Sequence, residues 1–283
     1  MILVTGATGT VGSEAVRLLS ARRHPARALV RDPSRVAHRA DLAGEIEIVT
    51  GDFDHPDTLD TAMDGIDTVI LVSPAVPAQE IAVIDSAVRQ GVTHLVKITS
   101  KASADSPVDR RRGQARIEAH LATTGLPHTL LRSNAYLQNL LALAPVVRQT
   151  RGFTMSAGDG PVGMIDARDV AAVATRVAIA PAAHAGRTYR LTGPGLITYA
   201  DIAKELSITL GHDIEYRRIR PDEHRAAMIR AGVPEAVATS NAQAFGLIAE
   251  GDAAWLTDEV ATLTGTAPHS LQTFIAEHAA AFA

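Results

Sequence analysis

The chain has 283 residues, of which 46% are hydrophobic and 20% are charged, and its formal net charge is −4. This composition is typical of a globular protein with its own core, and the length fits one large domain or a domain plus a smaller lobe. The sequence contains no cysteine, which excludes disulfide bonds, thiolate catalysis and cysteine-ligated zinc or iron–sulfur sites.

Charge and hydropathy also narrow the possible partners. The densest basic stretch, Arg110-Arg111-Arg112, is short and lacks interleaved aromatic residues, so we expect no nucleic-acid partner. No apolar run approaches the ~20 residues that span a bilayer, and no basic segment precedes the first apolar run, so we expect a cytoplasmic protein without a membrane partner. The histidines are scattered without an H-x-x-x-H pair, so we expect no metal site.

The first half alternates short apolar runs with helical stretches. Strands are predicted at residues 2–5, 26–30, 45–50, 68–73, 94–99 and 129–132. Helices are predicted near residues 11–21, 56–63, 78–90, 109–124 and 135–149. Repeated alternation of strand and helix predicts an α/β fold with a doubly wound parallel sheet of the Rossmann type.

The pattern changes after residue 150. Glycine and proline crowd residues 152–163, which we interpret as a loop region, and a helix is expected near 168–179. A strand at 188–192, a helix at 198–210, a strand near 214–219 and several further helices follow. We therefore predict a dinucleotide-binding domain over residues 1–150, on which the 168–179 helix packs back, and a smaller α/β lobe over residues 151–283.

A glycine-rich segment joins the first predicted strand to the first helix. It reads Thr5-Gly6-Ala7-Thr8-Gly9-Thr10-Val11-Gly12, a G-x-x-G-x-x-G spacing. Glycines at these positions permit a tight turn, close approach of the backbone to a pyrophosphate, and close packing of helix on strand. The helix N-terminus then offers free N–H groups to the phosphates, so the segment predicts a dinucleotide site rather than an ordinary turn.

The end of the second predicted strand favours NADP(H) over NAD(H). An NAD site usually places an acidic residue there, whereas here the first polar residue is Arg31, with Arg35 one helical turn on. A guanidinium can bind a 2′-phosphate bidentately. Asp32 is a complication because it could serve the ribose instead, and both arginines could also be ordinary solvated surface residues.

Polar residues follow three further strands, where an open α/β sheet binds its ligand. Asp52 and Phe53 lie where the adenine is expected, although a loop aspartate that caps the next helix is an equally good interpretation of Asp52. Ser73 and Pro74 end the fourth strand, and Thr99 and Ser100 end the fifth. Both of these pairs point at the nicotinamide half of the cofactor.

Five segments carry a family resemblance: ILVTGATGTVG at 2–12, ALVRDPSR at 28–35, GDFDHPDTLDTAMDGIDTVILVSP at 51–74, GLPHTLLRSNAYLQNLL at 125–141 and MIDARDVA at 164–171. In this order and spacing they resemble the NmrA-like atypical short-chain dehydrogenases, a group that includes NAD(P)H:quinone oxidoreductase-like proteins. The resemblance covers roughly the first 180 residues and is specific for fold and cofactor rather than for substrate.

The resemblance implies contacts between the dinucleotide and residues at the ends of the first four strands. These residues are Gly6, Thr8, Gly9, Thr10, Val11, Gly12, Arg31, Asp52, Phe53, Ser73 and Pro74. It also places Ser133 and Asn134 beside the nicotinamide. Asp166 and Asp169 match a D-x-x-D-V element that is mainly structural in relatives.

The usual catalytic pair of short-chain dehydrogenases is missing. That pair is Tyr-x-x-x-Lys on the helix after the fifth strand, where the tyrosine donates a proton and the lysine lowers its pKa. Counting back from Glu118 puts Arg110 at the tyrosine position and Gln114 at the lysine position. No tyrosine occurs before residue 136, so the absence does not depend on the alignment.

Three residues remain as candidates for a catalytic role. Lys101 could act as an acid or contact a phosphate, although a solvated loop lysine is the better-supported interpretation. Tyr136 could donate a proton or stack on a substrate, against the alternative of a packing tyrosine. Asn134 precedes it beside the expected nicotinamide.

We therefore expect an NADP(H)-dependent oxidoreductase, a monomer or homodimer, that acts on a quinone or related aromatic small molecule, a class that includes polyketide-derived molecules. Such an acceptor is electron-poor, so solvent could supply the proton and positioning does most of the work. One alternative is a non-catalytic NADP sensor that binds a partner protein, which the missing pair favours. Another is an unusual hydroxylation step in aromatic polyketide tailoring.

Overall fold

The computed structural model describes residues 1–35 and 46–283, which form two compact units. The first unit comprises Met1–Ala104, Arg111–Ser133 and Ala167–Arg190. The second comprises Asp105–Arg110, Asn134–Asp166 and Leu191–Ala283. Each unit is thus assembled from segments that are separated in the sequence.

Within the described part of the chain, the first unit is built on a seven-stranded sheet with the order β3-β2-β1-β4-β5-β6-β8. The strands are β1 (Ile2–Val4), β2 (Ala26–Val30), β3 (Ile46–Thr50), β4 (Thr68–Leu71), β5 (His94–Thr99), β6 (His128–Ser133) and β8 (Thr188–Leu191). All pairings from β3 through β6 are parallel. The order reverses at β1, so the carboxyl ends of β1 and β4 frame the topological switch point where such folds bind ligands.

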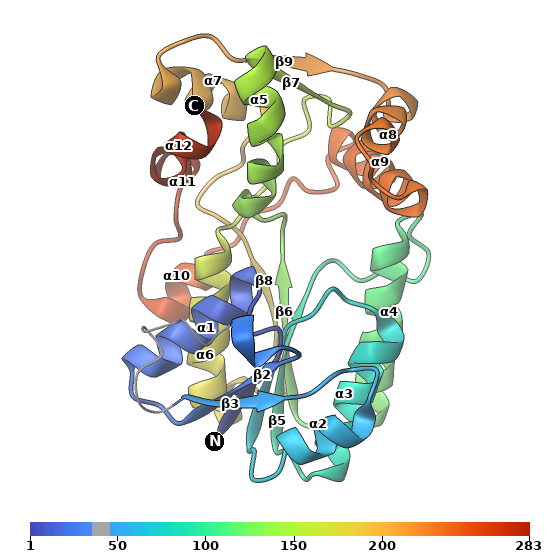
Figure 1. Ribbon diagram of the computed structural model, residues 1–283, viewed down its shortest axis with the longest axis vertical. Helices are drawn as coiled ribbons and strands as arrows, with labels where there is room; N and C mark the ends of the chain where they lie inside the picture. The colour runs from blue at the N-terminus through green and yellow to red at the C-terminus, as the bar shows by residue number, and fades with distance from the viewer. Residues whose placement is uncertain (36–45) are drawn as a thin grey trace. The chain divides into compact units, whose positions relative to one another are not determined.

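Helices cover both faces of this sheet (Figure 1), with α1 and α6 on one face and α2, α3 and α4 on the other. They are α1 (Thr10–Ala21), α2 (Pro56–Ala62), α3 (Pro77–Arg89), α4 (Asp109–Thr123) and α6 (Ala167–Ile179), with short 3₁₀ segments η1 (Pro33–Arg35) and η3 (Pro181–His184). Proline occupies the first turn of α2 and α3, where its missing N–H costs no hydrogen bond.

The central strands are buried on both faces, as parallel strands between two helix layers should be. Every residue of β4 and β5 is buried, which gives near-continuous apolar runs in the sequence. Lys97, in the middle of β5, interrupts the apolar run: it is a charged residue whose side chain is fully buried.

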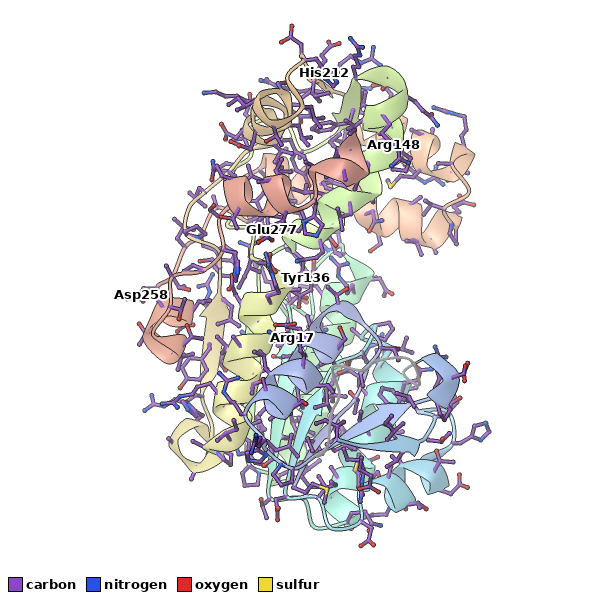
Figure 2. The ribbon with its side chains drawn as sticks, turned by 60° about the vertical axis from the view of Figure 1, so that its left-hand side comes forward. Arg17, Tyr136, Arg148, His212, Asp258 and Glu277 are labelled. Atoms are coloured by element: carbon purple, nitrogen blue, oxygen red, sulfur yellow. The ribbon has the colours of Figure 1, made fainter. Side chains whose placement is uncertain are left out.

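The second unit contains a two-stranded parallel sheet of β7 (Gly152–Met155) and β9 (Glu215–Arg218). Its helical elements are η2 (Leu137–Leu143), α5 (Ala144–Thr150), α7 (Tyr199–Leu210), α8 (Pro221–Arg230), α9 (Glu235–Ala249), α10 (Glu259–Thr264), α11 (Leu271–Glu277) and α12 (Ala279–Phe282). Arg148 of α5, labelled in Figure 2, donates to the carbonyl of Ala281 at 2.6 Å and so ties α5 to α12. Thr198 and Asp201 form a capping box that starts α7.

The α/β fold class predicted from the sequence is confirmed, and the predicted strands of the sheet are present. Glu45 of the predicted strand 45–50 lies outside the described residues. Two predictions were wrong. The helix expected at 135–149 is a 3₁₀ segment followed by α5, with Pro145 in the first turn of α5. The loop expected at 152–163 begins with β7, whose partner β9 lies far along the chain.

In the part of the chain that the structure describes, no helix has both the length and the apolar character needed to cross a membrane.

A buried histidine at the start of β5 makes the stability of the fold depend on pH. His94 Nε2 lies 2.9 Å from Thr129 Oγ1, whose own proton goes to the His184 carbonyl at 2.7 Å, so Nε2 must be the donor. Burial lowers the pKa of His94 from 6.5 to about 4, and His128 and His184 oppose a positive charge there. Between pH 6.5 and about 4, His94 is therefore neutral in the folded protein, whereas the same histidine is protonated in the unfolded chain.

We expect the free energy of unfolding to fall as the pH is lowered from about 6.5 towards 4, by up to about 3 kcal/mol from His94 alone. His94→Gln keeps a donor for Thr129 and removes this titration. Urea unfolding at a series of pH values should show a smaller loss in the variant than in the wild type. Equal losses in both proteins would contradict a neutral His94.

Candidate dinucleotide site

The glycine loop between β1 and α1 is shaped by close backbone approaches. Gly6 has a φ of +56°, and a Cβ added to it would lie 2.6 Å from the carbonyl oxygen of Val72 after β4. A Cβ on Gly12 would lie 2.2 Å from the carbonyl oxygen of Gly6. Both positions therefore require glycine, and both contacts draw the start of α1 into the switch point of the sheet.

The N-terminus of α1 has no side-chain cap. Gly9 is the N-cap residue and provides no side-chain hydrogen bond to the first turn, which contains no acidic residue. Thr8, Gly9 and Thr10 are exposed, whereas Val11 and Gly12 are buried against the sheet. Uncapped N–H groups at an exposed helix N-terminus form an anion site, so this loop fits a pyrophosphate.

The residues after β2 include both Arg31 and Asp32, and the contact of either with the cofactor stays a prediction. The carboxylate of Asp32 accepts hydrogen bonds from the backbone N–H and the hydroxyl of Ser34, at 3.0 and 2.7 Å. Asp32 therefore caps the turn into η1. Arg31 directly follows β2 and is exposed, a position from which a guanidinium can reach a 2′-phosphate.

Asp52 shapes the loop after β3. Its carboxylate accepts a hydrogen bond from the backbone N–H of Asp54 at 3.1 Å, and the N-cap residue of α2 is His55 rather than Asp52. Phe53 is half-buried and packs against the core of the first unit. Contact of these two residues with an adenine stays a prediction.

The ends of β1 and β4 are joined through Thr5. Its hydroxyl accepts the backbone N–H of Val72 and donates to the Val72 carbonyl, both at 2.8 Å. The following turn contains Ser73, which is half-buried, and Pro74, which is exposed. Ala75 in this turn has a φ of +64°, a conformation that residues other than glycine rarely adopt.

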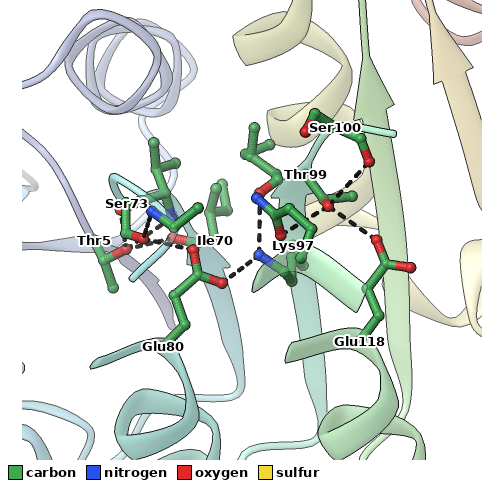
Figure 3. Close-up of polar contacts among 12 residues, drawn as sticks. Thr5, Ile70, Ser73, Glu80, Lys97, Thr99, Ser100 and Glu118 are labelled. Carbon is green, nitrogen blue, oxygen red and sulfur yellow. Dashed lines mark hydrogen bonds and ion pairs between the residues drawn. The ribbon is translucent and has the colours of Figure 1, made fainter. Parts of the chain in front are cut away.

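A polar network occupies the place where the usual catalytic pair would lie. The Thr99 hydroxyl lies 3.0 Å from Gln114 Oε1 and 2.9 Å from Glu118 Oε1, and Glu118 also pairs with Arg132. Gln114 is buried, so at the lysine position this chain has an amide fixed to the end of β5. Figure 3 shows Thr99 between Ser100 and Glu118.

Sequence reasoning missed a second buried network beside this one. The ammonium group of Lys97 pairs with Glu80 Oε2, and Glu80 Oε1 accepts a hydrogen bond of 2.5 Å from the Ser73 hydroxyl (Figure 3). The available signal was a lysine inside an otherwise apolar strand. A charge buried in a sheet needs a partner, and only the fold shows that the partner comes from α3.

The remaining candidates fall in different parts of the chain. Ser133 is buried at the end of β6 and donates to the Thr99 carbonyl at 3.3 Å. Asn134 begins a segment of the second unit, where its amide nitrogen donates to the Ala253 carbonyl at 3.0 Å and its amide oxygen accepts the Ala135 N–H at 2.8 Å. The bond to Ala253 ties two distant segments of the second unit together, and the bond to Ala135 is local.

Lys101 and Tyr136 remain open as catalytic candidates. Lys101 is exposed in the loop after β5. Tyr136, labelled in Figure 2, is half-buried and precedes η2, with a backbone bridge to Ile165. Neither position establishes contact with a substrate.

Comparison with known proteins agrees with this geometry. The NmrA-like family matches residues 1–265. The chain belongs to the NmrA-like family. It is 36% identical over 286 residues to an NAD(P)H azoreductase of Xenophilus azovorans, covering 100% of this chain and 99% of the relative. It is 32% identical over 246 residues to quinone oxidoreductase 2 of Escherichia coli, covering 84% of each chain.

A similar solved structure contains the cofactor. The NADPH-dependent quinone oxidoreductase of Escherichia coli, complexed with NADPH, superposes on this member of the NmrA-like family with a TM-score of 0.88. The two are 28% identical, and the match covers 99% of each chain. Contacts of the glycine loop, the N-terminus of α1 and Arg31 of this chain with a cofactor stay predictions.

Replacing Arg31 with alanine should separate the two nicotinamide cofactors. Loss of a charge-assisted bidentate contact to the 2′-phosphate removes about 1.5–3 kcal/mol, so the Kd for NADPH should rise roughly ten- to a hundredfold. The Kd for NADH should change little, because NADH lacks that phosphate. Fluorescence titration of both cofactors measures this, and equal weakening would show that Arg31 does not recognise the 2′-phosphate.

Proposed function

We propose that this NmrA-like protein is an NADP(H)-dependent oxidoreductase that reduces a quinone or a related aromatic small molecule. The observation that carries the proposal is the glycine loop, in which Gly6 and Gly12 bring the uncapped N-terminus of α1 to the switch point of the sheet. Arg31, at the end of the adjacent strand, suits the 2′-phosphate of the same cofactor.

The named activities of the relatives support an electron-poor acceptor. One is an azoreductase that uses NAD(P)H, and another is a quinone oxidoreductase. A third relative, 36% identical over 289 residues and from Streptomyces griseus, is named as a reductase of an alkanoyl-dihydrofuranone methyl phosphate. Two of these names describe a reduction and the third an oxidoreductase, so this chain fits hydride transfer from the cofactor to an acceptor.

The local chemistry is consistent with a reaction that needs little acid catalysis. Bound NADPH would supply the hydride. The side chains at the end of β5 hold one another, since Thr99 bonds to Gln114 and Glu118, and this arrangement fixes the floor of the site without a tyrosine. A quinone accepts a hydride readily, and its developing oxyanion can take a proton from water, so orientation of the two reactants is the main contribution.

The second unit is proposed to supply the surface that binds the substrate. Its core includes an aromatic cluster in which Phe153 stacks on Tyr216 with ring centroids 5.5 Å apart. Tyr199 contacts Phe245 edge-on at 6.0 Å. These rings pack against one another and stabilise the unit.

The test is consumption of NADPH, followed by its absorbance, with a panel of benzoquinones, naphthoquinones, anthraquinones and azo dyes. We expect turnover with at least one quinone and a strong preference for NADPH over NADH. Measurable NADPH binding without turnover of any acceptor would refute the reductase and leave the sensor as the better account. Failure to bind NADPH at all would refute both.

A further inference from the structure

We propose that Glu80 is a positioning residue for the nicotinamide half of the site, acting through Ser73, while Lys97 neutralises the charge of its buried carboxylate. Through Ser73, Glu80 fixes the turn at residues 73–76, which follows β4 at the switch point. This inference rests on the proposed function, because the turn matters for catalysis only if the cofactor lies against it.

Hydrogen bonds and an ion pair connect Lys97 in the sheet, through Glu80, to Ser73 in the turn (Figure 3). Lys97 and Glu80 are buried, with side-chain exposures of 0% and 1%, and pair directly. Glu80 Oε1 accepts the Ser73 hydroxyl proton at 2.5 Å. Ser73 Oγ in turn accepts the backbone N–H of Ala75 at 2.8 Å. The hydroxyl of Ser73 thus links the buried pair to the backbone of the turn, and that backbone is the part we expect to face the cofactor.

The turn needs such a support because its backbone is strained. Ala75 has a φ of +64°, in the left-handed region that a residue with a Cβ disfavours. Its N–H is held by Ser73 Oγ, whose own proton is accepted by Glu80. Without that acceptor we expect the turn to relax towards an ordinary conformation, which would move the backbone groups of residues 73–76.

A role in stability alone does not explain why a charged pair is used. Two apolar side chains of similar volume often stabilise a fold as well as a buried ion pair does, because the pair loses its hydration. An apolar pair, however, could not accept the hydrogen bond of Ser73. Lys97 offsets the charge of the buried Glu80 carboxylate by pairing with one of its oxygens, and the other oxygen accepts the Ser73 proton.

Two double variants separate the hydrogen bond from the charge. The acceptor-retaining variant combines Glu80→Gln with Lys97→Met, which removes both charges and keeps an oxygen that can accept the Ser73 proton. The acceptor-free variant combines Glu80→Met with Lys97→Met, which removes the same charges and the acceptor. The two proteins are matched in net charge and nearly in volume, so they differ in whether Ser73 is held.

We expect the acceptor-retaining variant to bind NADPH within about twofold of the wild type. The acceptor-free variant should bind it about three- to tenfold more weakly, the effect of one lost hydrogen bond. Its rate of quinone reduction at saturating NADPH should fall as well, because the nicotinamide is misplaced. Melting temperatures are measured for both. Equal NADPH affinities in the two double variants, or losses that simply follow their melting temperatures, would overturn the proposal.

Ser73→Ala provides a second route that leaves the ion pair intact. It should weaken NADPH binding as much as the acceptor-free double variant does, and combining the two should add little, because both break the same link. Additive losses would contradict the proposal. If wild-type protein fails to bind NADPH, the proposed function is wrong. If the wild type binds NADPH and the variants do not differ, only the role of Glu80 is wrong.

Discussion

At the switch point between β1 and β4 the backbone is packed so tightly that no side chain fits. A Cβ on Gly6 would lie 2.6 Å from the carbonyl oxygen of Val72, and one on Gly12 would lie 2.2 Å from that of Gly6. These approaches set the start of α1 directly over the carboxyl edge of the sheet. The helix N-terminus, the turn after β4 and the end of β2 with Arg31 then share that edge, which is where the Rossmann arrangement binds a dinucleotide.

The features visible in the sequence are those with a local cause. The glycine spacing, the apolar strands and the arginine after β2 each follow from a short stretch of chain, so each could be predicted without knowing the fold. Asp32 was ambiguous in the sequence because a single aspartate can serve a ribose or a turn. In the structure one oxygen of its carboxylate accepts hydrogen bonds from Ser34 in the turn.

The features missed in the sequence are those that depend on distant partners. The pair of Glu80 and Lys97 joins a helix to a strand 17 residues away, and nothing in either segment identifies the other. The strand β7 is too short to recognise and exists because it pairs with β9. The helix expected at 135–149 was wrong over its first half, where the chain forms a 3₁₀ segment before α5.

Buried polar groups near the carboxyl edge take the place of the missing tyrosine and lysine without copying their chemistry. Gln114 and Glu118 bind Thr99 at the end of β5, and Glu80 binds Ser73 after β4. We propose that both networks hold the rim of the sheet in place. A rigid site with little acid catalysis is best suited to acceptors that take up a hydride easily.

A crystal structure of the protein with NADPH bound tests this account most directly. The account predicts the pyrophosphate at the N-terminus of α1, the 2′-phosphate at Arg31 and the nicotinamide against residues 73–76. A cofactor bound away from the glycine loop, or with its adenosine end at the turn after β4, would contradict it.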